Sequence, residues 1–460
     1  MKIWGTDGPM ASLPDILDRR ERRAQSQREL LREGPCLVSF CMNIPGARKS
    51  FPLASAGFQE GLHQIRQALA DKPVLRCVRS GGVTGEEAML LVTADPSEIK
   101  GRMIALEENH PLGRLWDVDV LDGQGMSLSR QAFGHSRRAC LICSRDAKIC
   151  GRSQAHTMEQ LFDRTAQLLD GYFHAQAARR AADCVAQAML DEVSATPKPG
   201  LVDRGNSGSH RDMDYHTFLR SISALRPFFE DFFTLGWQQH DAPAEALFSA
   251  LREAGVRAEQ AMFATTGGVN THKGMIFSAA ILCGALGRLH AGVCPVELEE
   301  LRRECAQLGR CALPDFEAAG TSTAGLRCYR QLQVAGIRGE AASGFPAAME
   351  VALPALQAWK GLDAPANDRA LYALMHLIAQ VDDTNMIHRG GRGSALARKA
   401  EARALLPELT PENILSRLGQ LDASYIAENL SPGGCADLLS LAIALDHLQD
   451  QNLLYWNIRT

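Results

Sequence analysis

Two pairs of closely spaced aspartates are the first residues whose type and spacing indicate chemistry. Asp117 and Asp119 lie two residues apart in GRLWDVDV, and Asp382 and Asp383 are adjacent in VDDTNMIHRGGRG. Neighbouring carboxylates repel each other unless a cation lies between them. Mg²⁺ binds such oxygen ligands and commonly holds substrate phosphates as well. Each pair therefore predicts a magnesium and phosphate site, while a solvent-facing edge strand or a solvated turn remains the alternative.

Basic residues that suit phosphate accompany both pairs. Arg114 precedes the first pair, and Arg389, Gly390 and Gly391 follow the second. A guanidinium and open backbone N–H groups can surround phosphate oxygens. The second pair ends a helical run, where carboxylates oppose the negative end of the helix dipole. A bound cation would reverse that conflict.

A polar loop opens the second half of the chain. In ATPKPGLVDRGNSGSHRDMD, residues 195–214, two X-Pro steps stiffen the backbone, which favours a ligand site over a mobile surface loop. Its candidate side chains are Lys198, Asp203, His210 and Asp212.

Another loop precedes an apolar helix in TTGGVNTHKGMIFSAAIL, residues 265–282. Asn270 or Thr271 is expected to cap this helix. His272 and Lys273 then fall in its first turn, where cations are unfavourable and a bound anion would remove the conflict. The glycine-rich RGEAASGFP contributes Arg338 as a further phosphate candidate.

The segment after Asp119 contains Cys140, Cys143, Cys150 and His156. These residues could supply four tetrahedral zinc ligands. The last two are six residues apart, however, so we favour a reduced, partly buried thiol cluster. Arg152 in the same segment is a candidate for phosphate binding.

The elements that must position these residues change character along the chain. Strands are expected at 36–44, 73–79, 88–94 and 115–122, with helices at 11–33, 58–70 and 97–108. From about residue 157 helices dominate, at 157–193, 215–235, 244–264, 275–290, 296–308, 346–359, 368–381 and 434–449. We therefore expect an α/β or α+β domain over 1–176 and an all-α domain over 177–460.

Composition excludes several classes of function. The 460 residues carry a formal net charge of −4, so no global basic field attracts nucleic acid. The longest apolar stretch, GMIFSAAILCGALG, is shorter than the roughly 20 residues of a membrane span. The 13 cysteines lack disulfide-scaffold spacing and the N-terminus lacks a secretory apolar core. We expect a cytoplasmic protein.

The motifs TPKPGLVDRGNSGSH, NTHKG, RGEA with GFP, and DDTN with RGG resemble the triphosphoribosyl-dephospho-CoA synthase family over residues 180–460. Ser209 departs from the alanine expected beside His210. The motifs NIPG, GRLWDVDV and the cysteine segment resemble apo-citrate lyase phosphoribosyl-dephospho-CoA transferase over residues 1–175. The whole chain resembles a fusion of the two families.

The resemblance implies two consecutive reactions. The second domain would join ATP to 3′-dephospho-CoA and release adenine, giving 2′-(5″-triphosphoribosyl)-3′-dephospho-CoA. The first, nucleotidyltransferase-like domain would transfer the phosphoribosyl-dephospho-CoA group to a serine of the citrate lyase acyl carrier (gamma) subunit, releasing pyrophosphate. Mg²⁺ is expected in both domains. Asp203, Asp212 and the pair at 382–383 are then candidates for metal or base, with no single base assigned.

Three alternatives remain open at this point. The helical domain could hydrolyse ADP-ribosyl groups with Mg²⁺, which shares the chemistry at the ribose C1′ atom. The chain could bind nucleotides as a regulator without turnover. The same two reactions could also serve malonate decarboxylase.

Overall fold

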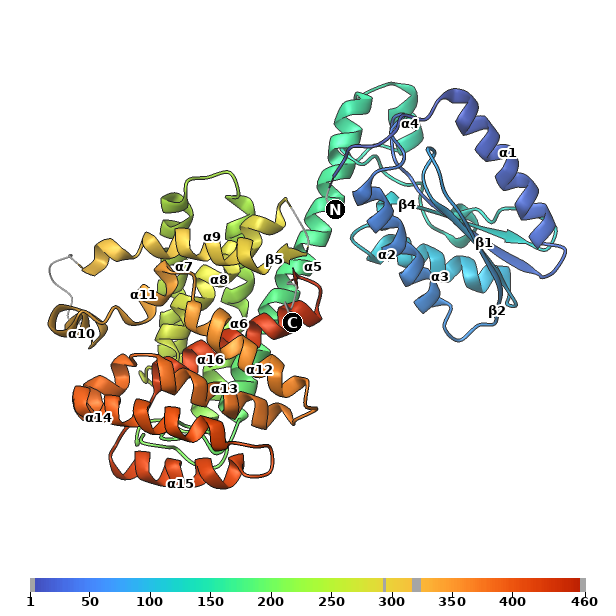
Figure 1. Ribbon diagram of the computed structural model, residues 1–460. Coiled ribbons are helices and arrows are strands. Elements are labelled where there is room, and N and C mark those ends of the chain that lie inside the picture. Colours follow the sequence, from blue (N-terminus) through green and yellow to red (C-terminus); the bar gives the residue numbers. More distant parts are fainter. Residues whose placement is uncertain (1–4, 293–294, 317–323, 456–460) are drawn as a thin grey trace. The chain divides into compact units, whose positions relative to one another are not determined.

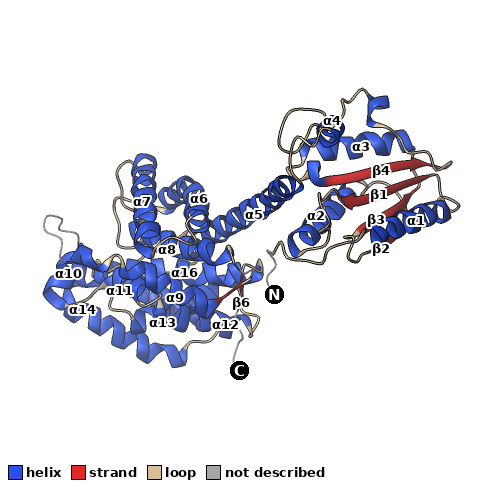
Figure 2. Cartoon of the chain, turned by 90° about the horizontal axis from the view of Figure 1, so that it is seen from above, coloured by secondary structure: helices blue, strands red, loops and turns tan. Residues whose placement is uncertain are grey.

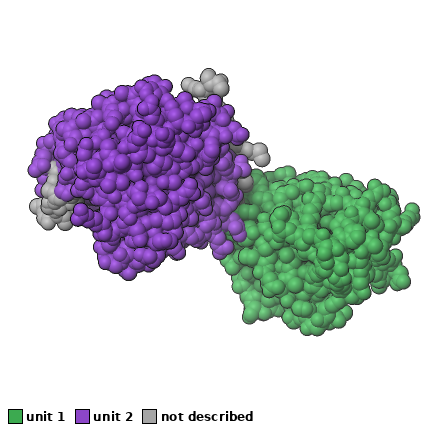
Figure 3. Space-filling view, turned by 90° about the horizontal axis from the view of Figure 1, so that it is seen from below, with its two compact units in different colours: residues 1–175 green, residues 176–460 purple. Residues whose placement is uncertain are grey.

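The computed structural model describes residues 5–292, 295–316 and 324–455, and divides into two compact units (Figure 3). The units comprise residues 1–175 and 176–460. Their boundary lies within one long helix, α5 (Met158–Ser194), next to the position expected from the sequence. A helix at the junction explains why no Gly- or Pro-rich linker is visible in the sequence.

The first unit is built on a four-stranded sheet in the order β2–β3–β1–β4 (Figure 2). The strands are β1 (Cys36–Met42), β2 (Val74–Ser80), β3 (Glu87–Val92) and β4 (Trp116–Asp122). Every neighbouring pair is antiparallel. Of the two expected classes the unit is therefore α+β, because an α/β fold needs parallel strands joined by crossovers.

Helices cover both faces of this sheet (Figure 1). On one face, α2 (Pro52–Ala68) and α3 (Pro96–Asn109) pack over a core that includes Phe40 and Trp116. On the other face, α1 (Leu13–Leu30) places Leu30 against Leu37 in a smaller apolar cluster. The short helix α4 (Ala147–Arg152) lies in the segment between β4 and α5.

In its described residues, the second unit has helices as its regular structure apart from one short parallel pairing, β5 (Val296–Glu297) with β6 (Leu454–Tyr455). Its almost fully buried helices are α8 (Lys273–His290) and α16 (Gly433–Asp450), which pack against each other. The surrounding helices are α6 (Tyr215–Gln238), α7 (Ala244–Thr266), α9 (Leu298–Arg310), α10 (Ala324–Leu332), α11 (Gly336–Ala342), α12 (Leu353–Lys360), α13 (Ala366–Gln380), α14 (Thr384–Leu405) and α15 (Ile414–Ala427). No helix among the described residues is both long and apolar enough to cross a membrane.

Two segments expected to be loops are helical. Arg338 lies within α11, and the stretch after Asp383 begins α14. The glycines of that stretch are accommodated because Gly391 forms a kink with φ 79° and ψ 167°, a backbone conformation that suits glycine. Gly390 lies close to Leu430, where a Cβ atom would approach the leucine Cδ2 atom to 2.3 Å. The two glycines thus lie within α14 and not in a loop, with open space only beside Gly391.

Candidate active sites

A cavity of about 1310 Å³ in the second unit is lined by residues from all four motifs that the sequence singled out. The predicted residues that line it are Lys198, His210, Asp212, Asn270, His272, Lys273, Arg338, Asp382, Asp383 and Arg389. These residues come from loops and helix ends that are up to about two hundred residues apart in sequence, and the packing of α8 against α16 brings them together.

Asp383 is the N-cap of α14 and does not end the preceding helix. Its Oδ1 atom accepts hydrogen bonds from the backbone N–H groups of Asn385 and Met386, at 2.8 and 3.0 Å. Its Oδ2 atom accepts one from Cys435 at 2.9 Å. The expected conflict with a helix dipole is therefore wrong for Asp383, since a carboxylate at a helix N-terminus is favourable. Burial nevertheless raises its pKa, against the effect of these bonds.

Asp382 has a different environment from its neighbour. Its side chain is mostly exposed at the cavity wall, and its Oδ1 atom accepts a hydrogen bond from Lys399 at 2.6 Å. The two adjacent carboxylates are thus held separately, one by backbone N–H groups and one by a lysine.

Two acidic residues that sequence reasoning missed line the same cavity as Asp383. Glu192, at the end of α5, forms an ion pair with Lys198 in which the two side chains are only 5% and 1% exposed. Asp437, on α16, also lines the cavity, and burial together with the charges of Glu192 and Asp383 raises its pKa well above the usual value. Glu192 is thus paired with a buried lysine, while Asp437 interacts with the carboxylates of Glu192 and Asp383.

The predicted cations are already paired within the protein. Lys273 contacts Glu259 with Nζ 2.8 Å from the carboxylate. Arg389 donates to the backbone carbonyl of Ser209 at 2.8 Å and lies 3.2 Å from Nδ1 of His210. The Ser209 hydroxyl, the one departure from the family motif, donates to the carbonyl of Leu430 at 2.6 Å.

The other predicted cation, Arg338, has a buried Nε atom that makes no hydrogen bond within the described part of the chain. Its guanidinium lies 3.7 Å from Asp315.

Two of the histidines that line the cavity, His210 and His272, have lowered pKa values, which favours the neutral imidazole. Burial and the adjacent Arg389 lower the pKa of His210, whose Nε2 atom is 3.0 Å from the Ser431 hydroxyl. Burial and the charge of Lys198 lower the pKa of His272 to about 3. His272 occupies the N-cap position of α8 without a side-chain capping bond, so the cap expected at Asn270 or Thr271 is displaced. Asn270 still accepts a hydrogen bond from the Lys273 N–H at 3.2 Å.

Asp203 lies outside the cavity lining and organises its own loop. Its carboxylate accepts hydrogen bonds from the backbone N–H groups of Lys198, Gly205 and Asn206. Every one of these bonds holds the backbone that positions Lys198. Asp212, by contrast, lines the cavity and is largely exposed.

In the first unit, Asp117 and Asp119 lie on one face of β4, and Trp116, Val118 and Val120 lie on the other, in the core. The alternation predicted from the sequence is confirmed, and β4 is also an edge strand. Although the Asp117 side chain reaches solvent, limited hydration against the sheet and the charge of Asp119 raise its pKa. Nearby Arg138, Arg23 and Lys100 partly offset that effect.

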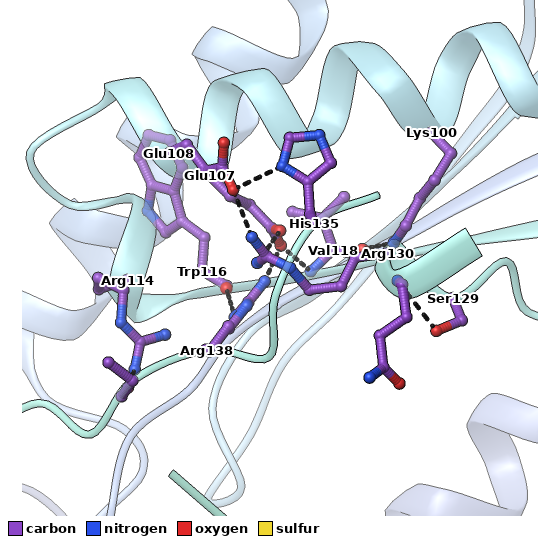
Figure 4. Close-up of polar contacts among 12 residues, drawn as sticks. Lys100, Glu107, Glu108, Arg114, Trp116, Val118, Ser129, Arg130, His135 and Arg138 are labelled. Atoms are coloured by element: carbon purple, nitrogen blue, oxygen red, sulfur yellow. Dashed lines mark hydrogen bonds and ion pairs between the residues drawn. The ribbon is translucent and has the colours of Figure 1, made fainter. Parts of the chain in front are cut away.

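Charged side chains cover the open backbone edge of β4 (Figure 4). Glu107 accepts from the Val118 N–H at 3.2 Å, and Lys100 donates to the Val118 carbonyl at 3.1 Å. Arg138 donates to the Trp116 carbonyl at 2.8 Å and pairs with Glu107. The network prevents further strand pairing and fixes a cation close to the acidic pair.

Arg114 lies near Arg138 and Arg130 and forms a basic group with them. It donates to the Ala139 carbonyl, and its Nη1 atom is buried without a hydrogen bond in the described structure. Burial and the charges of Arg138 and Arg130 lower its pKa. Arg152 lies exposed in the last turn of α4. Arg114 therefore suits an anion at this edge of the sheet.

Cys140, Cys143, Cys150 and His156 converge in the segment between β4 and α5. Their potential ligand atoms all lie within 4.8 Å of one another. The three cysteines are free thiols.

Comparison with known proteins identifies two transferase families in the one chain. Residues 11–172 match the family model described as apo-citrate lyase phosphoribosyl-dephospho-CoA transferase. Residues 178–454 match the model described as ATP:dephospho-CoA triphosphoribosyl transferase. The chain belongs to both families and is a bifunctional transferase of citrate lyase prosthetic-group maturation.

Full-length relatives carry the same fusion. Protein CitXG of Haemophilus influenzae is 35% identical, with 96% of this chain and 97% of the relative aligned. Protein CitXG of Leuconostoc mesenteroides is 33% identical over 96% of this chain and 98% of its own length. The 2-(5″-triphosphoribosyl)-3′-dephosphocoenzyme-A synthase of Haemophilus ducreyi is 36% identical over 66% of this chain and 98% of its own length.

Proposed function

We propose that the cavity of the second unit is where ATP and 3′-dephospho-CoA combine with release of adenine. The observation that carries this proposal is that all four motifs line one cavity of about 1310 Å³. That volume exceeds the range of roughly 300–1,000 Å³ usual for a single small ligand, which suits two nucleotides bound together. The hydrolase alternative needs space for only one nucleotide.

The buried acidic cluster of this cavity fits a divalent cation. The pKa values of Glu192, Asp383 and Asp437 are all raised, first by burial, and the charges of Glu192 and Asp383 add to the rise for Asp437. Asp437 and Asp383, with the exposed Asp382, would hold Mg²⁺, which would neutralise charge on the triphosphate. Lys273, Arg338 and Arg389 would bind phosphate oxygens.

His210 and His272 supply neutral donors or acceptors in the same cavity. Displacement of adenine builds positive charge at the ribose, so a neutral imidazole avoids the repulsion that an imidazolium would add. His210 borders Asp212, at 3.9 Å, and faces the cavity. His210 or Asp212 would accept the proton of an incoming hydroxyl.

In the first unit, Asp117 and Asp119 would hold Mg²⁺ for the transfer to the acyl carrier subunit. The raised pKa of Asp117 beside Asp119 fits a cation-binding pair. Arg114 and Arg138 would bind the pyrophosphate that leaves, since catalysis of phosphoryl transfer is mostly positioning and charge neutralisation. With these roles for the aspartates and arginines, we propose that the unit acts as a nucleotidyltransferase-like domain.

Incubation of the full chain with Mg²⁺, ATP and 3′-dephospho-CoA tests the proposal for the cavity. We expect free adenine by chromatography and the joined product by mass spectrometry, both dependent on 3′-dephospho-CoA. Adenine release without 3′-dephospho-CoA would favour the hydrolase. Nucleotide binding without any product would favour the regulator.

A further inference from the structure

We propose that Cys140, Cys143, Cys150 and His156 bind one structural zinc ion, which supports the arginine-bearing segment beside the Asp117 and Asp119 pair. This site has no part in either reaction as proposed above. It rests on four observations about the segment between β4 and α5.

The first observation is the spacing of the sulfur atoms. The Cys150 Sγ atom lies 3.5 Å from that of Cys140 and 3.9 Å from that of Cys143. Tetrahedral zinc with Zn–S bonds of about 2.3 Å separates its sulfur ligands by about 3.8 Å. A disulfide would require an S–S distance of about 2.05 Å, which neither pair approaches. The spacing therefore matches shared coordination of a metal.

The second observation is the completeness of the ligand set. The potential ligand atom of His156 lies within 4.8 Å of all three sulfur atoms. The Nε2 atom of this histidine is buried and has no hydrogen-bond partner within the described structure. Four protein ligands close a tetrahedral zinc site and leave no position for substrate, which indicates a structural ion.

The third observation is the backbone around the first two cysteines. Cys140 N–H donates to the Arg145 carbonyl at 2.8 Å and closes a tight turn that contains Cys143. The Ile142 N–H points to the Cys140 Sγ atom at 3.5 Å. Such N–H groups stabilise thiolate ligands from outside the coordination sphere. Cys150 is carried by α4, which ends at Arg152, and the short stretch after it brings His156 to the same cluster.

The fourth observation is how little of this segment is buried, although the partly buried Leu141 packs against the main core. Cys150 is the only buried residue between Gly123 and Thr157, whereas Ile142 and Ile149 are 41% and 59% exposed. A long connection with little regular structure needs some constraint to hold one conformation. Zinc binding to thiolates supplies folding free energy of that kind.

The consequence for function follows from Arg138 and Arg114. Arg138 lies two residues before Cys140 and reaches the Trp116 carbonyl and Glu107. Arg114 in turn donates to the Ala139 carbonyl, next to Cys140. The ion would therefore act as a positioning element for the basic groups beside the acidic pair.

The test is the metal content of the full chain, purified under reducing conditions without chelators. We expect about one zinc per chain in the wild type, lost in Cys143→Ser and Cys150→Ser. Cys77→Ser is the matched control, because Cys77 is exposed on β2 of the same unit, and should retain the zinc. Replacement of zinc by Co²⁺ should give the intense thiolate charge-transfer absorption and strong visible bands of a tetrahedral thiolate site.

A second readout separates the structural role from loss of folding. Removal of zinc by a chelator should expose the peptide bonds of residues 134–156 to limited proteolysis, and should reduce acyl carrier labelling while adenine release continues. If a serine variant fails to fold, the Co²⁺ spectrum of the wild type still shows whether thiolates bind the metal.

Three results would overturn the proposal. Reduced wild-type protein could contain no zinc and give no thiolate band with Co²⁺. Zinc could remain in both serine variants, which would place the ion elsewhere. A disulfide between Cys140 and Cys150 could form even with zinc supplied in excess, which would make the cluster a redox pair.

Discussion

The carboxylate of Asp437 lies against the first turn of α8, so that a Cβ atom on Gly274 would be only 2.1 Å from its Oδ2 atom. A helix N-terminus favours negative charge, and the absence of a side chain at Gly274 lets this carboxylate approach. The Asp437 carboxylate therefore already supplies negative charge where the sequence predicts a bound anion near Lys273. A substrate phosphate in the cavity has to share this helix end with Asp437 or bind beside it through a metal.

Asp437→Asn should make the second unit more stable and less active. Burial and two neighbouring carboxylates raise the pKa of Asp437, so its charge at neutral pH opposes folding. Removal of the charge should raise the free energy of unfolding, because the folded state then no longer holds a desolvated carboxylate beside two others. Adenine release should fall about 100-fold, while labelling of the acyl carrier from supplied triphosphoribosyl precursor stays normal.

The matched control for this variant is Asp446→Asn on the same helix. Asp446 pairs with Lys360 and Gln357, which are not part of the cavity lining. Asp446→Asn should therefore leave adenine release unchanged. Normal adenine release by Asp437→Asn would remove Asp437 from the proposed site.

Asp117→Asn should have the opposite effect on the two activities. Acyl carrier labelling should fall about 100-fold or more, because one of the two proposed ligands beside Arg138 would lose its charge. Adenine release should be unaffected, because the cavity residues all belong to the second unit. Both activities are measured on the same preparation, so a shared loss would indicate misfolding or a wrong assignment of the sites.

Asp122→Asn serves as the control within the same strand. The Asp122 carboxylate accepts hydrogen bonds from Gln124 and Met126 in the turn that follows β4. Asp122→Asn should slightly destabilise this turn and leave acyl carrier labelling intact. Equal losses in both variants would assign a structural role to Asp117.

Periodicity was sufficient to predict β4, because alternation of Trp116, Asp117, Val118 and Asp119 can bury only one face of a strand. The sequence alone does not assign Asp383 to a helix, since a carboxylate between two helices can belong to the end of either. The hydrogen bonds that assign it to α14 come from the backbone N–H groups of Asn385 and Cys435. Asp437 had one usable signal, its position within the apolar helix GGCADLLSLAIAL.

The convergence of distant residues was beyond local reasoning. Glu192 belongs to none of the motifs, and its partner Lys198 was identified only by the proline-rich loop that carries it. The meeting of the NTHKG and DDTN motifs depends on the packing of α8 and α16, which periodicity alone does not specify. The cysteine spacing likewise leaves both a zinc site and a thiol cluster open. The four ligand atoms come together only in the folded segment that contains α4, which the spacing alone does not show.

The buried ion pair of Lys198 and Glu192 should show strong energetic coupling. Lys198→Met leaves a buried, unpaired carboxylate, which typically costs about 3–5 kcal/mol of stability. The double variant with Glu192→Leu should regain much of that loss, because neither charge then remains. Urea unfolding of the second unit measures both values.

An exposed ion pair provides the comparison. Arg226 and Asp183 are 2.7 Å apart and partly open to solvent, so Arg226→Met should cost less than about 1 kcal/mol. If the double variant at Lys198 and Glu192 loses as much as the sum of its single variants, the pair is not coupled as the structure indicates.

His272 should make the second unit less stable in mild acid. Burial lowers its pKa from 6.5 to about 3, so the unfolded chain binds a proton that the folded protein excludes. Stability from this group is therefore complete above pH 6.5 and decreases steadily as the pH falls toward 3. At about pH 5 the loss should be about 2 kcal/mol, from 1.4 kcal/mol for each pH unit below the unfolded pKa.

Comparison of urea midpoints at about pH 7.5 and pH 5 in wild type and His272→Gln isolates this contribution. The glutamine variant should be less stable at the higher pH, because the hydrogen bond between the Ser221 hydroxyl and Nδ1 of His272, at 2.8 Å, is perturbed. It should also lose less stability on acidification than the wild type does. His216→Gln, at an exposed position of α6, should keep the full acid sensitivity. An unchanged pH slope in His272→Gln would mean that other groups, such as the buried His290, govern acid unfolding.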